Sequence, residues 1–256
     1  MASSSTVVAN ADSVAHVAHD SFTVHSGALS EDRLVNVHVP AGQAADARLP
    51  VLYMPDGGLD EDFPHVVAAV DSLIARRAIR PVIVVGVPNT QRRRDLTPPT
   101  RVASDSAIAK RVGGSAAFRR FLVDELRPMI ERRYRVTGER GIIGESLAGL
   151  FVMETLLESP SSFTHYIALD PSLWWDRGAL VESAGARLTV LDAAVRTLYV
   201  ASSLEPSTAV PVARLAGMLR ASPPRGLRWS HVPRPDLTHG NMFQGLETAA
   251  LADAFR

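Results

Sequence analysis

Residues 141–158 read GIIGESLAGLFVMETLLE, and they carry the clearest structural signal in the chain. A short apolar run leads into Ser146, and apolar residues then recur at helical spacing. A buried strand that turns sharply into a helix, with a serine at the turn, is the local structure of a nucleophile elbow. The turn strains the serine backbone, so its neighbours must be small, as Gly144, Ala148 and Gly149 are. The stretch therefore predicts a strand, a tight turn and a helix that present Ser146 as a nucleophile.

The rest of the chain extends this pattern. The nearly continuous apolar runs PVLYM, PVIVVGV, YIAL and TLYVA are typical of strands buried on both faces of a parallel sheet. The earlier segments FTVHS and RLVNVHVP alternate in polarity, as half-buried antiparallel edge strands do. Helical periodicity predicts helices over 64–77, 115–133 with a kink at Pro128, 147–158, 208–220 and 242–255. Together these elements predict an α/β fold with a doubly wound, mostly parallel sheet and antiparallel N-terminal edge strands.

Composition narrows the classes of function. Hydrophobic residues make up 46% of the 256 residues, which suits one large core. Lys plus Arg equals Asp plus Glu at 27 each, so the basic field of a nucleic-acid binder is missing. No stretch reads as a membrane span or a secretory signal, so we expect no membrane partner and a cytoplasmic location. We expect a flexible N-terminal arm over 1–18 and a single domain over 19–256.

The elbow pattern by itself is weak, because residues 113–117, GGSAA, also match it. Context separates the two serines. Ser115 follows a polar stretch and begins a predicted helix, so helix capping explains it. Ser146 follows a buried strand, so it is the predicted nucleophile.

The base that activates Ser146 is expected to be a histidine in a loop after the last strand. His165 precedes the run YIAL, which places it at the wrong end of the sheet, and His231 lies within the strand-like LRWSHV. His239 follows that strand and precedes the final helix, where its imidazole can return to the crevice. We therefore predict His239 as the base.

The acid that orients this imidazole should follow a strand between Ser146 and His239. Glu205 follows TLYVASSL, the penultimate strand, which is the commonest acid position in such folds. Asp170 ends YIALD one strand earlier and is the alternative. We prefer Glu205.

The oxyanion hole needs two backbone N–H groups. One is expected from Leu147, directly after the nucleophile. The other is expected from the loop PDGG at 55–58, where adjacent glycines let bare backbone approach a substrate, with Gly58 the better candidate.

With these residues placed, the sequence resembles the putative-esterase family, the esterase D and ferric-siderophore esterase-like branch of the α/β-hydrolase superfamily. The resemblance rests on PVLYMPDGG, VGVPNT, the Arg92-x-Arg94-Asp95-x-Thr97-Pro98 pattern, FLVDELRPMIERRY, GESLAG and DPSLWWD at 170–176. It implies an α/β-hydrolase fold without a large cap domain. Asp170 stands where the siderophore-esterase-like group usually has serine, which strengthens Asp170 as the alternative acid.

Substrate contacts are expected beside this site. Trp174 and Trp175 follow a strand end, where they are candidates to wall an acyl or aryl pocket. Arg94, in the long irregular stretch 89–112, is a candidate to contact an anionic ester. The His16-x-x-His19 pair lacks the glutamate and helix of a zinc protease motif, so we predict no metal, and no cofactor is expected.

The predicted function is a serine carboxylic-ester hydrolase that acts through an acyl-enzyme on small or exposed esters, including siderophore-type or aryl esters. One alternative is an acyltransferase that uses the same residues and passes the acyl group to another acceptor. The other is a catalytically silent binding protein on the same scaffold. The expected partner is a small-molecule ester, and the sequence does not decide the oligomeric state.

Overall fold

The computed structural model describes residues 18–189 and 191–256. The arm expected over 1–18 lies outside these residues except for Ala18, and so does His16. In the described part of the chain, no helix combines the length and apolar character needed to cross a bilayer.

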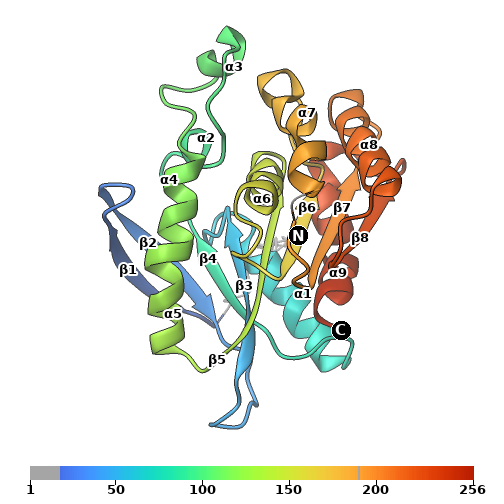
Figure 1. Ribbon diagram of the computed structural model, residues 1–256. Coiled ribbons are helices and arrows are strands. Elements are labelled where there is room, and N and C mark those ends of the chain that lie inside the picture. Colours follow the sequence, from blue (N-terminus) through green and yellow to red (C-terminus); the bar gives the residue numbers. More distant parts are fainter. Residues whose placement is uncertain (1–17, 190) are drawn as a thin grey trace, which may run out of the picture.

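An eight-stranded sheet with strand order β1-β2-β4-β3-β5-β6-β7-β8 forms the centre of the molecule (Figure 1). Its strands are β1 (Asp20–Ser26), β2 (Glu31–His38), β3 (Leu49–Pro55), β4 (Ile83–Val87), β5 (Val136–Glu145), β6 (His165–Leu169), β7 (Arg196–Ser202) and β8 (Leu227–Pro233). Strand β2 pairs antiparallel with β1 and β4, whereas β3 to β8 are mutually parallel. The predicted doubly wound sheet with antiparallel N-terminal edge strands is therefore confirmed.

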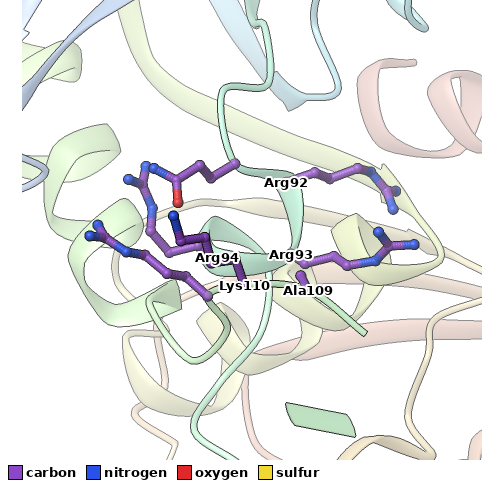
Figure 2. A pocket seen from close by; sticks show the side chains of 7 residues that line it. Arg92, Arg93, Arg94, Ala109 and Lys110 are labelled. Carbon is purple, nitrogen blue, oxygen red and sulfur yellow. The ribbon is translucent and has the colours of Figure 1, made fainter. Parts of the chain in front are cut away.

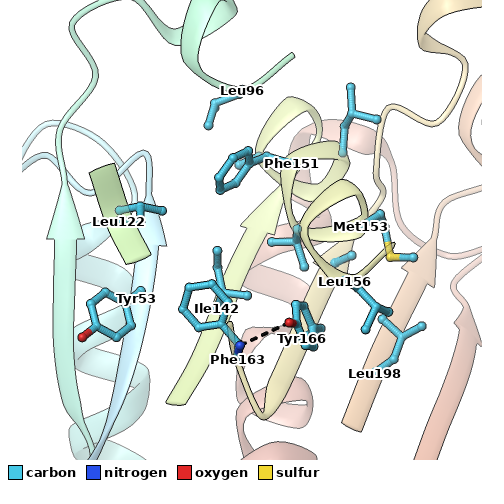
Figure 3. Close-up of a cluster of buried hydrophobic side chains, with 14 of the residues drawn as sticks. Tyr53, Leu96, Leu122, Ile142, Phe151, Met153, Leu156, Phe163, Tyr166 and Leu198 are labelled. Carbon is cyan, nitrogen blue, oxygen red and sulfur yellow. Dashed lines mark hydrogen bonds between the residues drawn. The ribbon is translucent and has the colours of Figure 1, made fainter. Parts of the chain in front are cut away.

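Helices cover both faces of the sheet. On one face, α1 (Phe63–Ala75) and α9 (Met242–Phe255) pack against each other and against one apolar cluster. The second cluster lies on the other face beneath α4 (Ser115–Arg120), α5 (Arg127–Arg133), α6 (Leu147–Glu158), α7 (Trp175–Thr189) and α8 (Pro206–Ala221). Within this second cluster the buried Tyr166 hydroxyl accepts a hydrogen bond from the Phe163 N–H at 3.2 Å (Figure 3). Each face thus has its own core, as a doubly wound sheet requires.

The helix predicted over 115–133 is interrupted by a π-helical segment, Phe121–Leu126, between α4 and α5. Pro128 lies in the first turn of α5, where its missing N–H is tolerated. The irregular stretch 89–112 contains the short helices α2 (Arg92–Asp95) and α3 (Ala103–Ala107). This stretch follows β4 and extends beyond the carboxyl end of the sheet (Figure 1). It therefore lies at the same edge of the sheet as the ends of β5 to β8.

Candidate active site

Ser146 occupies the turn between β5 and α6. Its backbone has φ 59° and ψ −119°, a conformation that a non-glycine residue adopts only under constraint. The constraint comes from both sides, because the Ser146 N–H donates to the Leu169 carbonyl and its own carbonyl accepts from Ser172 N–H. The strained turn predicted for Ser146 is present.

Small neighbours make this turn possible. A Cβ added to Gly144 would lie 2.6 Å from the Ala148 Cβ and 2.7 Å from its carbonyl carbon. A Cβ on Gly149 would lie 3.0 Å from the Pro171 Cα. The helix and strands therefore approach more closely than larger side chains would allow.

His239 reaches Ser146 from the other end of the chain. It begins the short 3-10 turn η2 (His239–Asn241) after β8, and reciprocal hydrogen bonds between Thr238 and Asn241 fix that turn. The imidazole Nε2 lies 3.1 Å from the Ser146 Oγ, and Nδ1 lies 2.7 Å from the Asp170 Oδ2. One imidazole thus contacts a hydroxyl on one side and a carboxylate on the other.

Asp170 is fully buried directly after β6, with φ 42°. Its Oδ1 accepts the Ser203 N–H at 2.8 Å, and its Oδ2 accepts the Ser203 hydroxyl at 2.9 Å in addition to His239. Burial acts to raise the pKa of Asp170, but hydrogen bonds from His239, Ser203 and Thr208 outweigh it and hold the pKa below its usual value. The hydrogen bond to Asp170 in turn raises the pKa of His239 despite partial burial. The carboxylate therefore favours the imidazolium form.

The structure corrects the preference for Glu205. This exposed residue occupies the N-cap position of α8 without a capping hydrogen bond from its side chain, and within the described residues its carboxylate accepts one hydrogen bond, from the backbone N–H of His239 at 3.4 Å. The carboxylate that reaches Nδ1 is instead that of Asp170, one strand earlier, whose Oδ2 lies 2.7 Å from it. Asp170, the alternative acid, makes the contact expected of the orienting residue.

The two expected oxyanion donors differ in their surroundings. Leu147 begins α6, so its N–H is among the first four of the helix, which lack intrahelical acceptors. The Gly58 N–H instead donates to the Glu61 carboxylate at 2.8 Å. Glu61 also accepts a 2.7 Å hydrogen bond from the Asn89 side chain. Gly58 can serve an oxyanion only after Glu61 moves away.

The structure places the residues predicted to contact substrate in different environments. Trp174 is 37% exposed and lines a hollow of about 410 Å³ between α7 and α8. Trp175 is 1% exposed and donates its indole N–H to the Pro98 carbonyl at 2.9 Å, so it anchors the long loop instead of facing a ligand. Arg94 is committed to Glu31 through two hydrogen bonds of 2.9 and 2.8 Å and also binds Asp95. The buried, hydrogen-bonded Trp175 is therefore not placed to contact a substrate, whereas Arg94 lines a surface hollow but holds its guanidinium against these two carboxylates.

Ser115, the serine of the duplicate motif, begins α4, so the predicted helix start is correct. Its hydroxyl does not cap the helix but donates to the buried Glu154 at 3.0 Å. Sequence reasoning did not single out Ser203, which binds Asp170, or Ser172, whose Oγ lies 3.4 Å from the Ser146 Oγ. A signal for Ser172 was its place in DPSLWWD, next to Asp170.

A second ionic cluster lies nearby on α1 and α9. The His65 imidazole contacts Glu247 at 2.5 Å and Asp62 at 3.1 Å. Burial acts to lower the pKa of His65, but the two carboxylates outweigh it and raise the pKa to about 9. His65 is therefore a cation at neutral pH. Within 18–189 and 191–256, no three His, Asp or Glu side chains, these included, are arranged so that they could hold a metal ion.

A mostly parallel sheet with a strained serine after one strand and a histidine after the last defines the α/β-hydrolase class. Residues 26–213 match the family described as Putative esterase, and the chain belongs to that family.

Individual relatives agree with this assignment. Ferri-bacillibactin esterase BesA of Bacillus subtilis is 32% identical over 167 residues, 58% of this chain and 57% of the relative. A siderophore enterobactin esterase of Emericella nidulans is 30% identical over 165 residues, 56% of this chain and 53% of the relative. The chain thus spans little more than half the length of these relatives. The crystal structure of an IroE-like serine hydrolase from Shewanella oneidensis superposes with a TM-score of 0.81 and 28% identity, over 93% of this chain and 78% of that one.

Proposed function

We propose that the protein is a serine carboxylic-ester hydrolase with Ser146 as nucleophile, His239 as general base and acid, and Asp170 as the orienting acid. The observation that supports it is the continuous contact from Asp170 Oδ2 to His239 Nδ1, and from His239 Nε2 to Ser146 Oγ. The contact distances of 2.7 and 3.1 Å lie within the range needed for proton transfer.

In this mechanism His239 takes the Ser146 proton as Oγ attacks the ester carbonyl. The tetrahedral intermediate collapses when the alcohol leaves with the proton from Nε2, and Ser146 stays acylated. His239 then takes a proton from water as the water oxygen attacks the acyl carbon, and it returns this proton to the Ser146 Oγ when the acyl–Oγ bond breaks and the acid leaves. Buried and ionised, Asp170 stabilises the imidazolium that forms in each half-reaction.

The developing oxyanion is held by the N–H of Leu147 and of Gly58. The Gly58 donor requires that the substrate carbonyl displaces the Glu61 carboxylate, which the Asn89 side chain can retain. This exchange replaces one acceptor by another at the same donor, so no buried N–H is left unpaired.

We propose siderophore-type esters, which are anionic and often aromatic, as the substrate class, because the relatives are named for such esters. The hollow beside Trp174 offers an exposed aromatic face to an aryl group. A second hollow of about 350 Å³ is lined by the basic residues 92–94, 110 and 111 (Figure 2). Among the described residues no carboxylate pairs with Arg93, Lys110 or Arg111, so the latter hollow has uncompensated positive charge.

Labelling with a fluorophosphonate probe tests the proposed activity. Wild-type protein should be labelled, and Ser146→Ala, with an unchanged thermal transition, should not. A folded wild type that resists the probe would overturn the proposal.

For the substrate class, the double variant Lys110→Ala, Arg111→Ala should raise KM for an anionic ester and leave KM for a neutral p-nitrophenyl ester unaltered. An equal change for both esters would exclude recognition of charge by this hollow.

A further inference from the structure

Glu145, the residue between Gly144 and the nucleophile, makes a contact that the proposed reaction does not use. It ends β5, and its Oε1 accepts the backbone N–H of Phe243 at 3.1 Å. Phe243 is the second residue of α9, so its N–H has no acceptor within the helix. The carboxylate therefore satisfies a helix N-terminus from a different element of the fold.

Both ends of this contact lie next to a reacting side chain. Ser146 directly follows Glu145, and His239 begins the 3-10 turn that leads into α9. The contact joins residues 98 positions apart and closes a short ring that contains the Ser146 hydroxyl and the His239 imidazole. We propose that Glu145 is a positioning residue that ties the histidine segment to the nucleophile elbow and sets the distance between Ser146 and His239.

Phe243, whose N–H donates to Glu145, is held firmly by its neighbours. Phe243 is buried and packs edge-on against the His65 ring, with the ring centroids 5.0 Å apart. The hydrogen bonds between Thr238 and Asn241 hold the near side of the turn. His239 itself is about one-third exposed, so packing leaves part of its ring unrestrained. A tie on each side of the turn compensates for this exposure.

The charge of Glu145 adds a second effect. Three titratable groups from different elements face this carboxyl: His239 on η2, Asp170 after β6 and Asp62 before α1. Burial, together with Asp62 and Asp170, raises the pKa of Glu145 to about 7, against the opposing influence of His239 and the Phe243 N–H. Ionised Glu145 in turn helps to raise the pKa of His239. The charge of Glu145 and the protonation of His239 are therefore coupled, because each carboxylate or imidazolium charge stabilises the other.

This inference rests on the proposed hydrolase activity. Two substitutions separate the hydrogen bond of Glu145 to Phe243 from the charge of the Glu145 carboxylate. Glu145→Gln keeps an oxygen acceptor of the same reach without the charge, and Glu145→Ala removes both. We expect Glu145→Ala to lower kcat for p-nitrophenyl acetate by about tenfold to a hundredfold with little change in KM, because misplacement by about 1 Å costs about that much. Glu145→Gln should lower kcat less and shift the acidic limb of the kcat/KM profile to lower pH. Glu131→Gln on α5 removes an exposed carboxylate elsewhere and serves as the matched control.

Probe labelling keeps the two proposals distinct. If wild-type protein is not labelled, the proposed hydrolase fails. If wild type is labelled and folded Glu145→Ala reacts at the same rate, only the positioning role fails. Should Glu145→Ala not fold, Glu145→Gln decides, because a purely structural role would leave the acidic limb where it is in wild type and in Glu131→Gln.

Discussion

Asp170→Asn changes one atom of the hydrogen-bond chain and leaves its shape intact. The Ser203 N–H donates to Oδ1, so the amide oxygen of an asparagine must occupy that position. The amide nitrogen then replaces Oδ2, facing the Ser203 hydroxyl and the His239 Nδ1. The hydroxyl can reverse and accept, so the fold loses little. The imidazole cannot keep its proton on Nδ1 opposite a donor, and Nε2 then holds the proton and ceases to be a base for Ser146.

The magnitude follows from this tautomer change. A comparable aspartate-to-asparagine exchange in a serine protease with the same three-residue arrangement lowers kcat by about 10⁴. Asp170 is buried, and no second carboxylate accepts from the His239 Nδ1 in the described structure. We therefore expect kcat/KM to fall by about 10³ to 10⁴, or about 4 to 5.5 kcal/mol of transition-state stabilisation. Glu205→Gln alters a 3.4 Å contact to the backbone of His239 and should cost about twofold.

Initial rates of p-nitrophenyl acetate hydrolysis compare Asp170→Asn with Glu205→Gln directly. Thermal unfolding checks that both variants are folded. The reasoning is refuted if folded Asp170→Asn retains more than about a tenth of wild-type kcat/KM, or if Glu205→Gln loses more than about tenfold. Either result would return the acid role to Glu205.

Further predictions concern packing and charge. Gly144→Ala should destabilise the protein by about 1 to 3 kcal/mol in denaturant unfolding, because its Cβ would meet backbone and Cβ atoms of Ala148 within 2.8 Å; an unchanged midpoint would contradict this. Trp175→Ala should cost about 3 to 5 kcal/mol, whereas Trp174→Ala should cost far less and raise KM for aryl esters over acetyl esters; equal losses of stability would contradict the assignment. The raised pKa of His65 means that its ionic cluster contributes fully below the ordinary value of 6.5, and this contribution is lost as the pH rises through about 9. We expect the Tm of wild type to decline more than the Tm of His65→Gln between pH 6.5 and about 9. An equal decline in both would contradict a stabilising contribution from the His65 cluster.

The sheet and helices were largely predictable because their signals are local. The helix after the nucleophile begins and ends where its periodicity predicts, at Leu147 and Glu158, and the last helix likewise spans 242–255. The long helix predicted over 115–133 was less accurate, since a π-helical segment changes its hydrogen bonding without changing its apolar spacing.

The site residues show the same contrast between features that local sequence indicates and features that depend on contacts distant in sequence. Arg94 looked available to a ligand because its partner, Glu31, lies 63 positions away on β2. That pairing lowers the pKa of Glu31 to about 2, and no feature of the loop sequence indicates it. Gly58 looked like bare backbone, yet the carboxylate three residues later accepts its N–H. Trp174 and Trp175 are adjacent in sequence but differ in exposure, because Trp175 joins the core cluster and donates its indole N–H to Pro98 of the long loop.

The sequence by itself determined Ser146 and its strained turn, since the small residues that permit the turn lie within a few positions of it. His239 as the candidate base also follows from the sequence, because the other two histidines after Ser146, His165 and His231, lie before or within a strand-like run. The tertiary structure decided between Asp170 and Glu205, which are both carboxylates at strand ends. Asp170 and His239 are 69 positions apart, and only the folded backbone fixes which carboxylate faces Nδ1. The contact of Glu145 with Phe243 on α9 joins residues 98 positions apart, so it too is hidden in the sequence and forms only when these distant parts of the chain meet.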